Sequence, residues 1–105
     1  LSTHEAIVDG LRGNLLYSSD YGDSWTSLPT NTNSSLFSAR TTTRQTLIVG
    51  DAGTYLQLAT ANQSIQTDQS ENRLPILNLT QTASGAIYGV GPFGPQKLSV
   101  SGKEQ

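Results

Sequence analysis

Short runs of apolar or alternating residues, separated by clusters of Gly, Asp, Asn and Ser, make up most of the chain. Runs of this length with these separators predict β-strands joined by turns. No window of helical length has apolar residues at the spacing i, i+3, i+4, i+7, so we expect no long helix. The pattern predicts ten strands, at residues 5–9, 14–19, 24–28, 36–42, 46–49, 54–60, 64–67, 74–82, 86–90 and 96–101. Between them we expect a polar loop at 29–34, a charged connector at 68–73 and a turn at 91–95.

The sequence also repeats itself after a shift of forty positions, and a third copy begins near residue 87 with an offset of forty-one. The matching positions are glycines and large apolar residues: Gly10 with Gly50 and Gly91, Gly13 with Gly53 and Gly94, Val8 with Ile48, Leu16 with Leu56, and Trp25 with Ile65. A period of about forty residues that contains several short strands is typical of the four-stranded blades of a β-propeller.

If the strands of a blade are labelled A to D from the propeller axis outward, the chain is expected to contain BCD, ABCD and ABC. The predicted fold is therefore all-β, a partial β-propeller of about two and a half four-stranded antiparallel blades. Residues 1–30 would form a blade remnant, 34–68 a complete blade and 74–105 a blade that lacks its outer strand. Because a closed ring takes at least about four blades, we expect the remaining blades to come from a longer protein, of which this chain is a C-terminal part, or from another copy of the chain.

The segment 18–25 reads S-x-D-x-G-x-S-W and lies between two predicted strands. Asp20 can accept hydrogen bonds from residues that follow it, and Gly22 can adopt a positive φ without steric cost. Ser24 can bond back across the loop, and Trp25 can place its ring under the turn. Together with Ser18, these residues predict a structural turn that folds locally.

This segment resembles the Asp-box, the turn motif of BNR-type β-propellers. The phrase VGDAGTYL at 49–56 is similar to the VGDxGTxL phrase of the Ycf48-like branch, which contains photosystem II assembly factors. The resemblance implies a non-catalytic scaffold that docks on a membrane-protein subunit or assembly intermediate outside the cytoplasm, in the periplasm or the thylakoid lumen. Asp-boxes also occur in sialidases and other glycosidases, so a fragment of such an enzyme is an alternative. A lectin-like module that oligomerises into a ring is a further alternative.

Charge and composition exclude several other classes. Six basic and eight acidic residues are spread thinly and give a net charge of −2, so nothing favours nucleic acid as a partner. The chain has no Cys and one histidine, His4, which argues against a zinc site, and we expect no metal and no cofactor. No apolar run approaches the ~18 residues of a transmembrane helix.

Two sets of residues could carry chemistry in a glycosidase. A glycosidase needs two carboxylates about 5–9 Å apart on either side of one bond. Asp20 and Asp23 are the candidate pair, but we expect the Asp20 carboxylate to be engaged by backbone N–H groups of its own turn. Sialidases hold a substrate carboxylate with three arginines, since guanidinium pairs with it bidentately. The available arginines, Arg12, Arg40, Arg44 and Arg73, follow no such pattern. We therefore expect no catalytic residue.

A candidate ligand or partner face consists of Asp51, Arg12 and Phe93. Asp51 follows Gly50 and is expected to lie near the propeller axis, with Asp9 at the equivalent place in the first repeat. Phe93 lies in a turn between two prolines, where an exposed aromatic side chain can anchor a protein partner.

Overall fold

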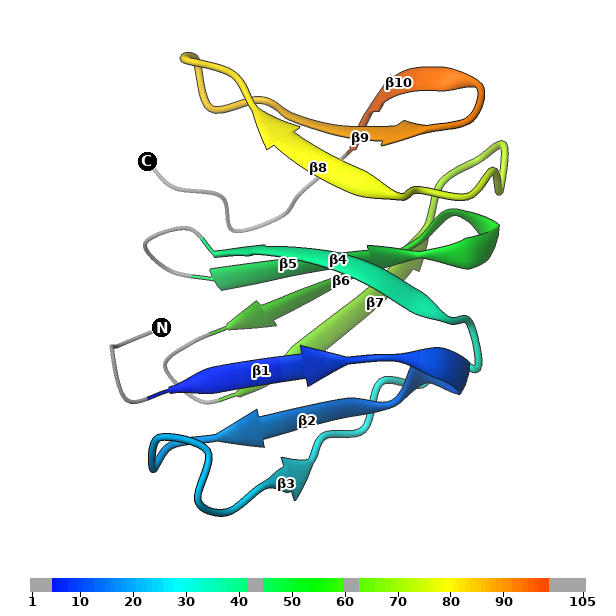
Figure 1. Ribbon diagram of the computed structural model, residues 1–105. Coiled ribbons are helices and arrows are strands. Elements are labelled where there is room, and N and C mark those ends of the chain that lie inside the picture. Colours follow the sequence, from blue (N-terminus) through cyan, green and yellow to red (C-terminus); the bar gives the residue numbers. More distant parts are fainter. Residues whose placement is uncertain (1–4, 42–44, 60–62, 99–105) are drawn as a thin grey trace.

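The computed structural model describes residues 5–41, 45–59 and 63–98, which form three antiparallel sheets and contain no α-helix (Figure 1). The first sheet consists of β1 (Ala6–Asp9), β2 (Leu15–Ser18) and β3 (Thr26–Ser27). The second consists of β4 (Leu36–Thr41), β5 (Gln45–Gly50), β6 (Thr54–Ala59) and β7 (Ile65–Gln69). The third consists of β8 (Asn78–Gln81), β9 (Ile87–Gly91) and β10 (Gly94–Lys97). The predicted all-β class is confirmed, with ten strands in the described residues.

The second sheet is covered on both faces, because it lies between the other two (Figure 1). Successive side chains of a strand point to opposite faces, and in β5 they enter different cores. Ile48 packs toward the first sheet, whereas Leu47 and Val49 pack toward the third. This double burial explains the uninterrupted apolar run in the middle of β5, all of whose residues are buried.

The forty-residue repeat of the sequence is also a repeat of backbone geometry. A 3-10 turn, η1 (Leu11–Gly13), joins β1 to β2, and a second, η2 (Asp51–Gly53), joins β5 to β6. Their central residues have nearly the same left-handed conformation, φ 60° and ψ 30° at Arg12 and φ 55° and ψ 27° at Ala52. Each turn ends on a glycine with positive φ, as the G-x-x-G spacing requires.

The connections between consecutive sheets repeat as well. The backbone N–H of Leu36 donates to the carbonyl of Gly10 at 2.8 Å, and the N–H of Ile76 donates to the carbonyl of Gly50 at 2.9 Å. Both donors and both acceptors are forty residues apart. The first and second sheets are therefore each hydrogen-bonded at the same point to the segment that leads into the next sheet.

Several predicted boundaries differ from the structure, and three of the differences have a clear cause in the backbone hydrogen bonds. The connector expected from Asp68 begins later, because Asp68 and Gln69 pair with β6. The strand expected from Leu74 begins at Asn78, since Pro75 has no N–H and the N–H of Ile76 is donated to the second sheet.

The third error concerns the turn expected at 91–95. Gly94 pairs with Gly91, so the turn is limited to Pro92 and Phe93, and Pro95 lies inside β10. The N–H of Leu98 donates to Ile87 of β9, and alternation then directs the nitrogen of Pro95 away from β9, where a missing donor is tolerated. The predicted strand ends at Thr42, Thr60 and Ser101 lie outside the described residues.

Asp9 is not the equivalent of Asp51, contrary to expectation. It belongs to β1, pairs with Leu15 and occupies the position of Val49 in the repeat, whereas Asp51 lies in an exposed turn. Its Oδ2 atom is buried and has no hydrogen-bond partner among the described residues. Burial raises the pKa of the Asp9 carboxyl above 3.8, with its own backbone N–H opposing the shift.

Replacing Asp9 should therefore stabilise the protein. A raised pKa in the folded state means that this carboxyl lowers the free energy of unfolding as the pH rises through that pKa. We expect Asp9→Val, the residue of the equivalent position, to raise the free energy of unfolding at pH 7 by about 1 kcal/mol and to leave it less dependent on pH between 3 and 7. Urea denaturation at several pH values measures this, and a variant that is less stable than wild type at pH 7 would contradict it.

The two matched glycines at the ends of β1 and β5 should respond differently to substitution. Both have extended backbones, with φ −169° at Gly10 and −164° at Gly50. A Cβ at Gly50 would lie 2.0 Å from the carbonyl oxygen of Ser35, whereas a Cβ at Gly10 would meet nothing within 4 Å. We expect Gly50→Ala to cost about 1–3 kcal/mol, and Gly10→Ala to stay within about 0.5 kcal/mol of wild type, as measured by chemical denaturation. Equal effects at the two sites would be evidence against the close approach.

Candidate functional site

The turn between β2 and β3 is held by the side chains expected from the sequence. Asp20 Oδ1 accepts from the Ser24 N–H at 2.9 Å and from the Ser18 hydroxyl at 2.8 Å, and Asp20 Oδ2 accepts from the Ser24 hydroxyl. The Gly22 N–H donates to Ser18 Oγ at 2.9 Å. Gly22 has φ 85°, and Tyr21 before it also has a positive φ, 63°, which the sequence did not reveal.

Both carboxylate oxygens of Asp20 are thus engaged within the turn. Hydrogen bonds from Ser24, and then from Ser18, lower the pKa of the Asp20 carboxyl to about 2. An ionised carboxylate that is already hydrogen-bonded in this way is poorly suited to act as a general acid. Trp25 lies beside the turn, since a Cβ at Gly22 would be 3.4 Å from its Cζ2 atom, but 41% of Trp25 remains exposed.

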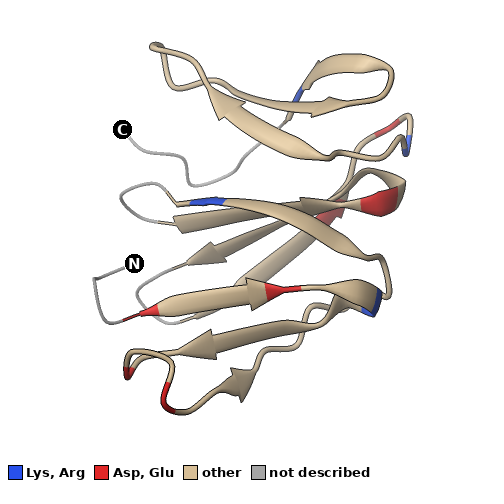
Figure 2. Ribbon diagram, viewed as in Figure 1, with Lys and Arg blue, Asp and Glu red and all other residues tan. Residues whose placement is uncertain are grey.

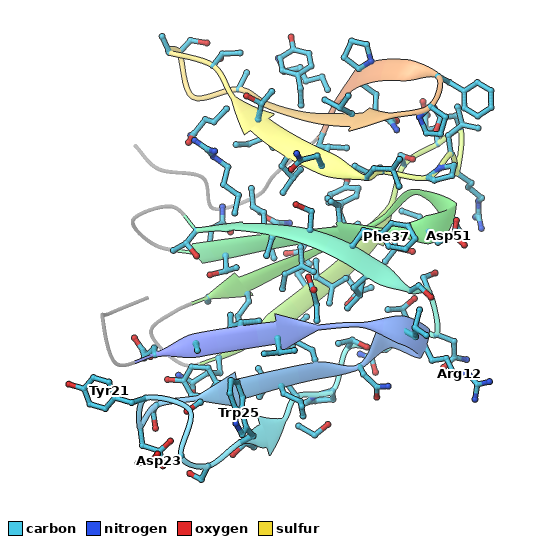
Figure 3. All side chains as sticks on the ribbon, viewed as in Figure 1. Arg12, Tyr21, Asp23, Trp25, Phe37 and Asp51 are labelled. Carbon is cyan, nitrogen blue, oxygen red and sulfur yellow. The ribbon has the colours of Figure 1, made fainter. Side chains whose placement is uncertain are left out.

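Arg12, Asp51 and Phe93 lie in three turns at one edge of the stack, one turn for each sheet. Figure 3 shows Arg12 and Asp51 on this side, and Tyr21 and Asp23 on the other. We call residues 10–14, 50–54 and 91–94 the turn edge. The Asp51 carboxylate accepts from the N–H of Ala52 at 2.9 Å, so it serves at least partly to hold its own turn.

Sequence analysis missed most of the apolar surface beside this edge. Phe93 is 75% exposed and Leu11, in η1, is 70% exposed. Phe37 and Leu77 are also exposed, and each follows the residue whose N–H is bonded to a glycine carbonyl of the preceding sheet. The forty-residue spacing of Phe37 and Leu77 was the available signal.

The described arginines do not form a clamp. Arg12 lies in η1, Arg40 on β4 and Arg73 in the connector after β7, and Figure 2 shows the basic residues on separate elements. Arg44 and His4 lie outside the described residues. Within the described ranges, no group of three His, Cys, Asp or Glu side chains could hold a metal ion. The part of the chain that the structure describes contains no helix able to span a bilayer.

Two polar grooves lie beside β7 and β10, and one carboxylate side chain lines each of them. The larger, about 480 Å³, runs between residues 69–72 and β10 and contains Glu71. The smaller, about 390 Å³, lies between residues 31–32 and β7 and contains Asp68. Neither groove offers the facing carboxylate pair that glycoside hydrolysis uses.

Substitution of Asp20 should test its structural role. Asp20→Ala removes the acceptor for Ser24 and Ser18, so we expect a lower melting temperature at pH 7, whereas Asp23→Ala, in the same turn, should leave it unchanged. Because the folded-state pKa of Asp20 is lowered to about 2, its stabilising effect should be complete above pH 4 and should disappear as the pH falls through 2. Thermal denaturation of both variants between pH 2 and 7 measures this. Similar melting temperatures for Asp20→Ala and wild type at pH 7 would refute the role.

Comparison of the chain with models of protein families, with curated proteins and with solved structures found no match in any of the three.

Proposed function

We propose that the chain is a non-catalytic scaffold that binds a protein partner through the turn edge, as part of a β-propeller that resembles the Ycf48-like assembly factors. The observation that carries the proposal is the set of exposed apolar side chains on and beside that edge. Leu11 and Phe93 project from short turns, while Phe37 and Leu77 flank them.

The arrangement of the sheets supports the propeller part of the proposal. Three antiparallel sheets are layered one on another, and their turns and connecting hydrogen bonds recur every forty residues. In this interpretation the first sheet is the blade remnant predicted at residues 1–30, and the second is the complete blade predicted at 34–68, which extends to Gln69. The third sheet is the blade predicted at 74–105 that lacks its outer strand. β4 and β8 would be inner strands, and the Ser38 hydroxyl donates to Asn78 Oδ1 between them at 3.0 Å.

The rigidity of the edge supports binding. Binding residues are commonly carried on loops that a rigid scaffold positions. Here the turns leave only two to five residues between paired strands, and Gly13 and Gly53 adopt positive φ angles of 75° and 71°. Aromatic and apolar side chains held in this way suit the centre of a protein interface. Arg12 and Asp51 on the same edge would supply polar contacts at its rim.

The kind of partner is proposed from the resemblance. The resemblance to Ycf48-like proteins implies that the partner is a membrane-protein subunit or an assembly intermediate, encountered in the periplasm or the thylakoid lumen. This step is an analogy between folds and motifs, and it needs a direct test.

Site-specific crosslinking provides that test. The photoreactive residue p-benzoylphenylalanine is introduced at Phe93 on the turn edge and, as the matched control, at Tyr21, which is 80% exposed in the turn on the other side. We expect one discrete adduct with a membrane-protein subunit from position 93 and none from position 21. Leu77→Asp should reduce the yield about tenfold, because it places a charge in the apolar surface. Equal adducts from both positions would contradict the proposal.

An enzymatic assay covers the glycosidase alternative. We expect no turnover of fluorogenic sialosides and other glycosides above the uncatalysed rate. Turnover that is lost in Glu71→Gln or Asp68→Asn, the carboxylates of the two grooves, would overturn the non-catalytic assignment.

A further inference from the structure

The outer face of the first sheet carries apolar side chains, and no other sheet of the described residues covers it. Val8 pairs with Leu16 across β1 and β2, and their side chains lie on the face away from the second sheet. They are 50% and 37% exposed, and Trp25, just before β3, is 41% exposed. Apolar side chains gathered on one sheet face usually mark an interaction surface.

The second sheet shows what covers such a face. Shifted by forty residues, Val8, Leu16 and Trp25 become Ile48, Leu56 and Ile65. Those three side chains belong to the core between the first and second sheets. The first sheet therefore presents to solvent the same set of positions with which the second sheet packs on its neighbour.

The third sheet presents the other half of that contact. With the offset of forty-one, Leu47 and Val49 correspond to Tyr88 and Val90. Leu47 and Val49 pack from the second sheet onto the third, whereas Val90, on the outer face of the third sheet, is 41% exposed. The two uncovered faces are thus complementary halves of an interface that the chain forms twice within itself.

We propose that a second copy of this chain docks head to tail, with the outer face of its third sheet on the outer face of the first sheet. The occupant is inferred from continuity with the internal interfaces, because the second copy brings the positions that those interfaces use. A symmetric contact would instead place Val8 and Leu16 against themselves, which neither internal interface does. The proposed contact is heterologous, so association can continue into a ring or a longer stack. It uses faces other than the turn edge and does not rest on the proposed function.

Two variants, each altering one half of the contact, test the proposal. Val8→Asp with Leu16→Asp blocks the first-sheet face, and Val90→Asp blocks the third-sheet face; Leu11→Asp, on the turn edge, is the control. In analytical ultracentrifugation, wild type and control should show a mass that rises with concentration above the 11.2 kDa of one chain. Each blocked variant alone should be monomeric, with at least about 100-fold weaker association, since a charge would be buried.

An equimolar mixture of the two blocked variants should form a dimer and nothing larger, because one intact half remains on each chain. A wild-type protein that stays monomeric at 200 µM, association of Val90→Asp at the wild-type level, or a mixture that stays monomeric while wild type associates would each overturn the proposal.

Cysteine trapping tests the same contact without buried charge, should an aspartate variant fail to fold. The chain has no cysteine of its own. Oxidation of Leu16→Cys mixed with Val90→Cys should give a disulfide-linked dimer in much higher yield than either variant alone. Equal yields from Leu16→Cys alone would show a symmetric contact and overturn the head-to-tail arrangement.

Discussion

Burial of the second sheet on both faces is the constraint on which the rest of the structure depends. β5 sends Ile48 into one core and Leu47 and Val49 into the other, so neither the first nor the third sheet can be removed without exposing it. Apolar burial of this kind is the main favourable term in folding. A three-stranded sheet that is covered on a single face buries little apolar surface. The chain therefore behaves as a stack in which each sheet depends on its neighbour.

The repeated turns convert this stacking into a fixed geometry. The carbonyls of Gly10 and Gly50 accept the N–H groups of Leu36 and Ile76, at or just before the first strand of the next sheet. Because Gly50 lacks a Cβ, Ser35 can approach closely enough for its carbonyl to accept the Asp51 N–H at 2.9 Å. These contacts fix the position of the turn edge relative to the sheets. The carboxylate of Asp20, whose pKa is lowered to about 2, is occupied in a turn.

Features that depend on residues close together in the sequence could be predicted from it. Features that depend on how neighbouring strands and sheets pack against one another could not. The number of strands, the positive φ of Gly22 and the hydrogen bonds to Asp20 follow from short-range patterns. By contrast, Pro95 is accommodated in β10 because its nitrogen faces away from β9. The buried Asp9 Oδ2 atom belongs to a side chain on the face of β1 that lies against the second sheet. The positive φ of Tyr21, Arg12 and Ala52 was missed because these residue types seldom adopt it.

Native-state hydrogen exchange measures the central claim most directly, because it reports the local opening of individual backbone amides. If the doubly covered sheet organises the molecule, the amides of Leu47, Ile48 and Val49 should exchange most slowly. The amides of Leu36 and Ile76, which fasten one sheet to the next, should be protected with them. Exchange in β5 as fast as in β1 and β9, with no protection at Leu36 and Ile76, would contradict a stack held together by its middle sheet.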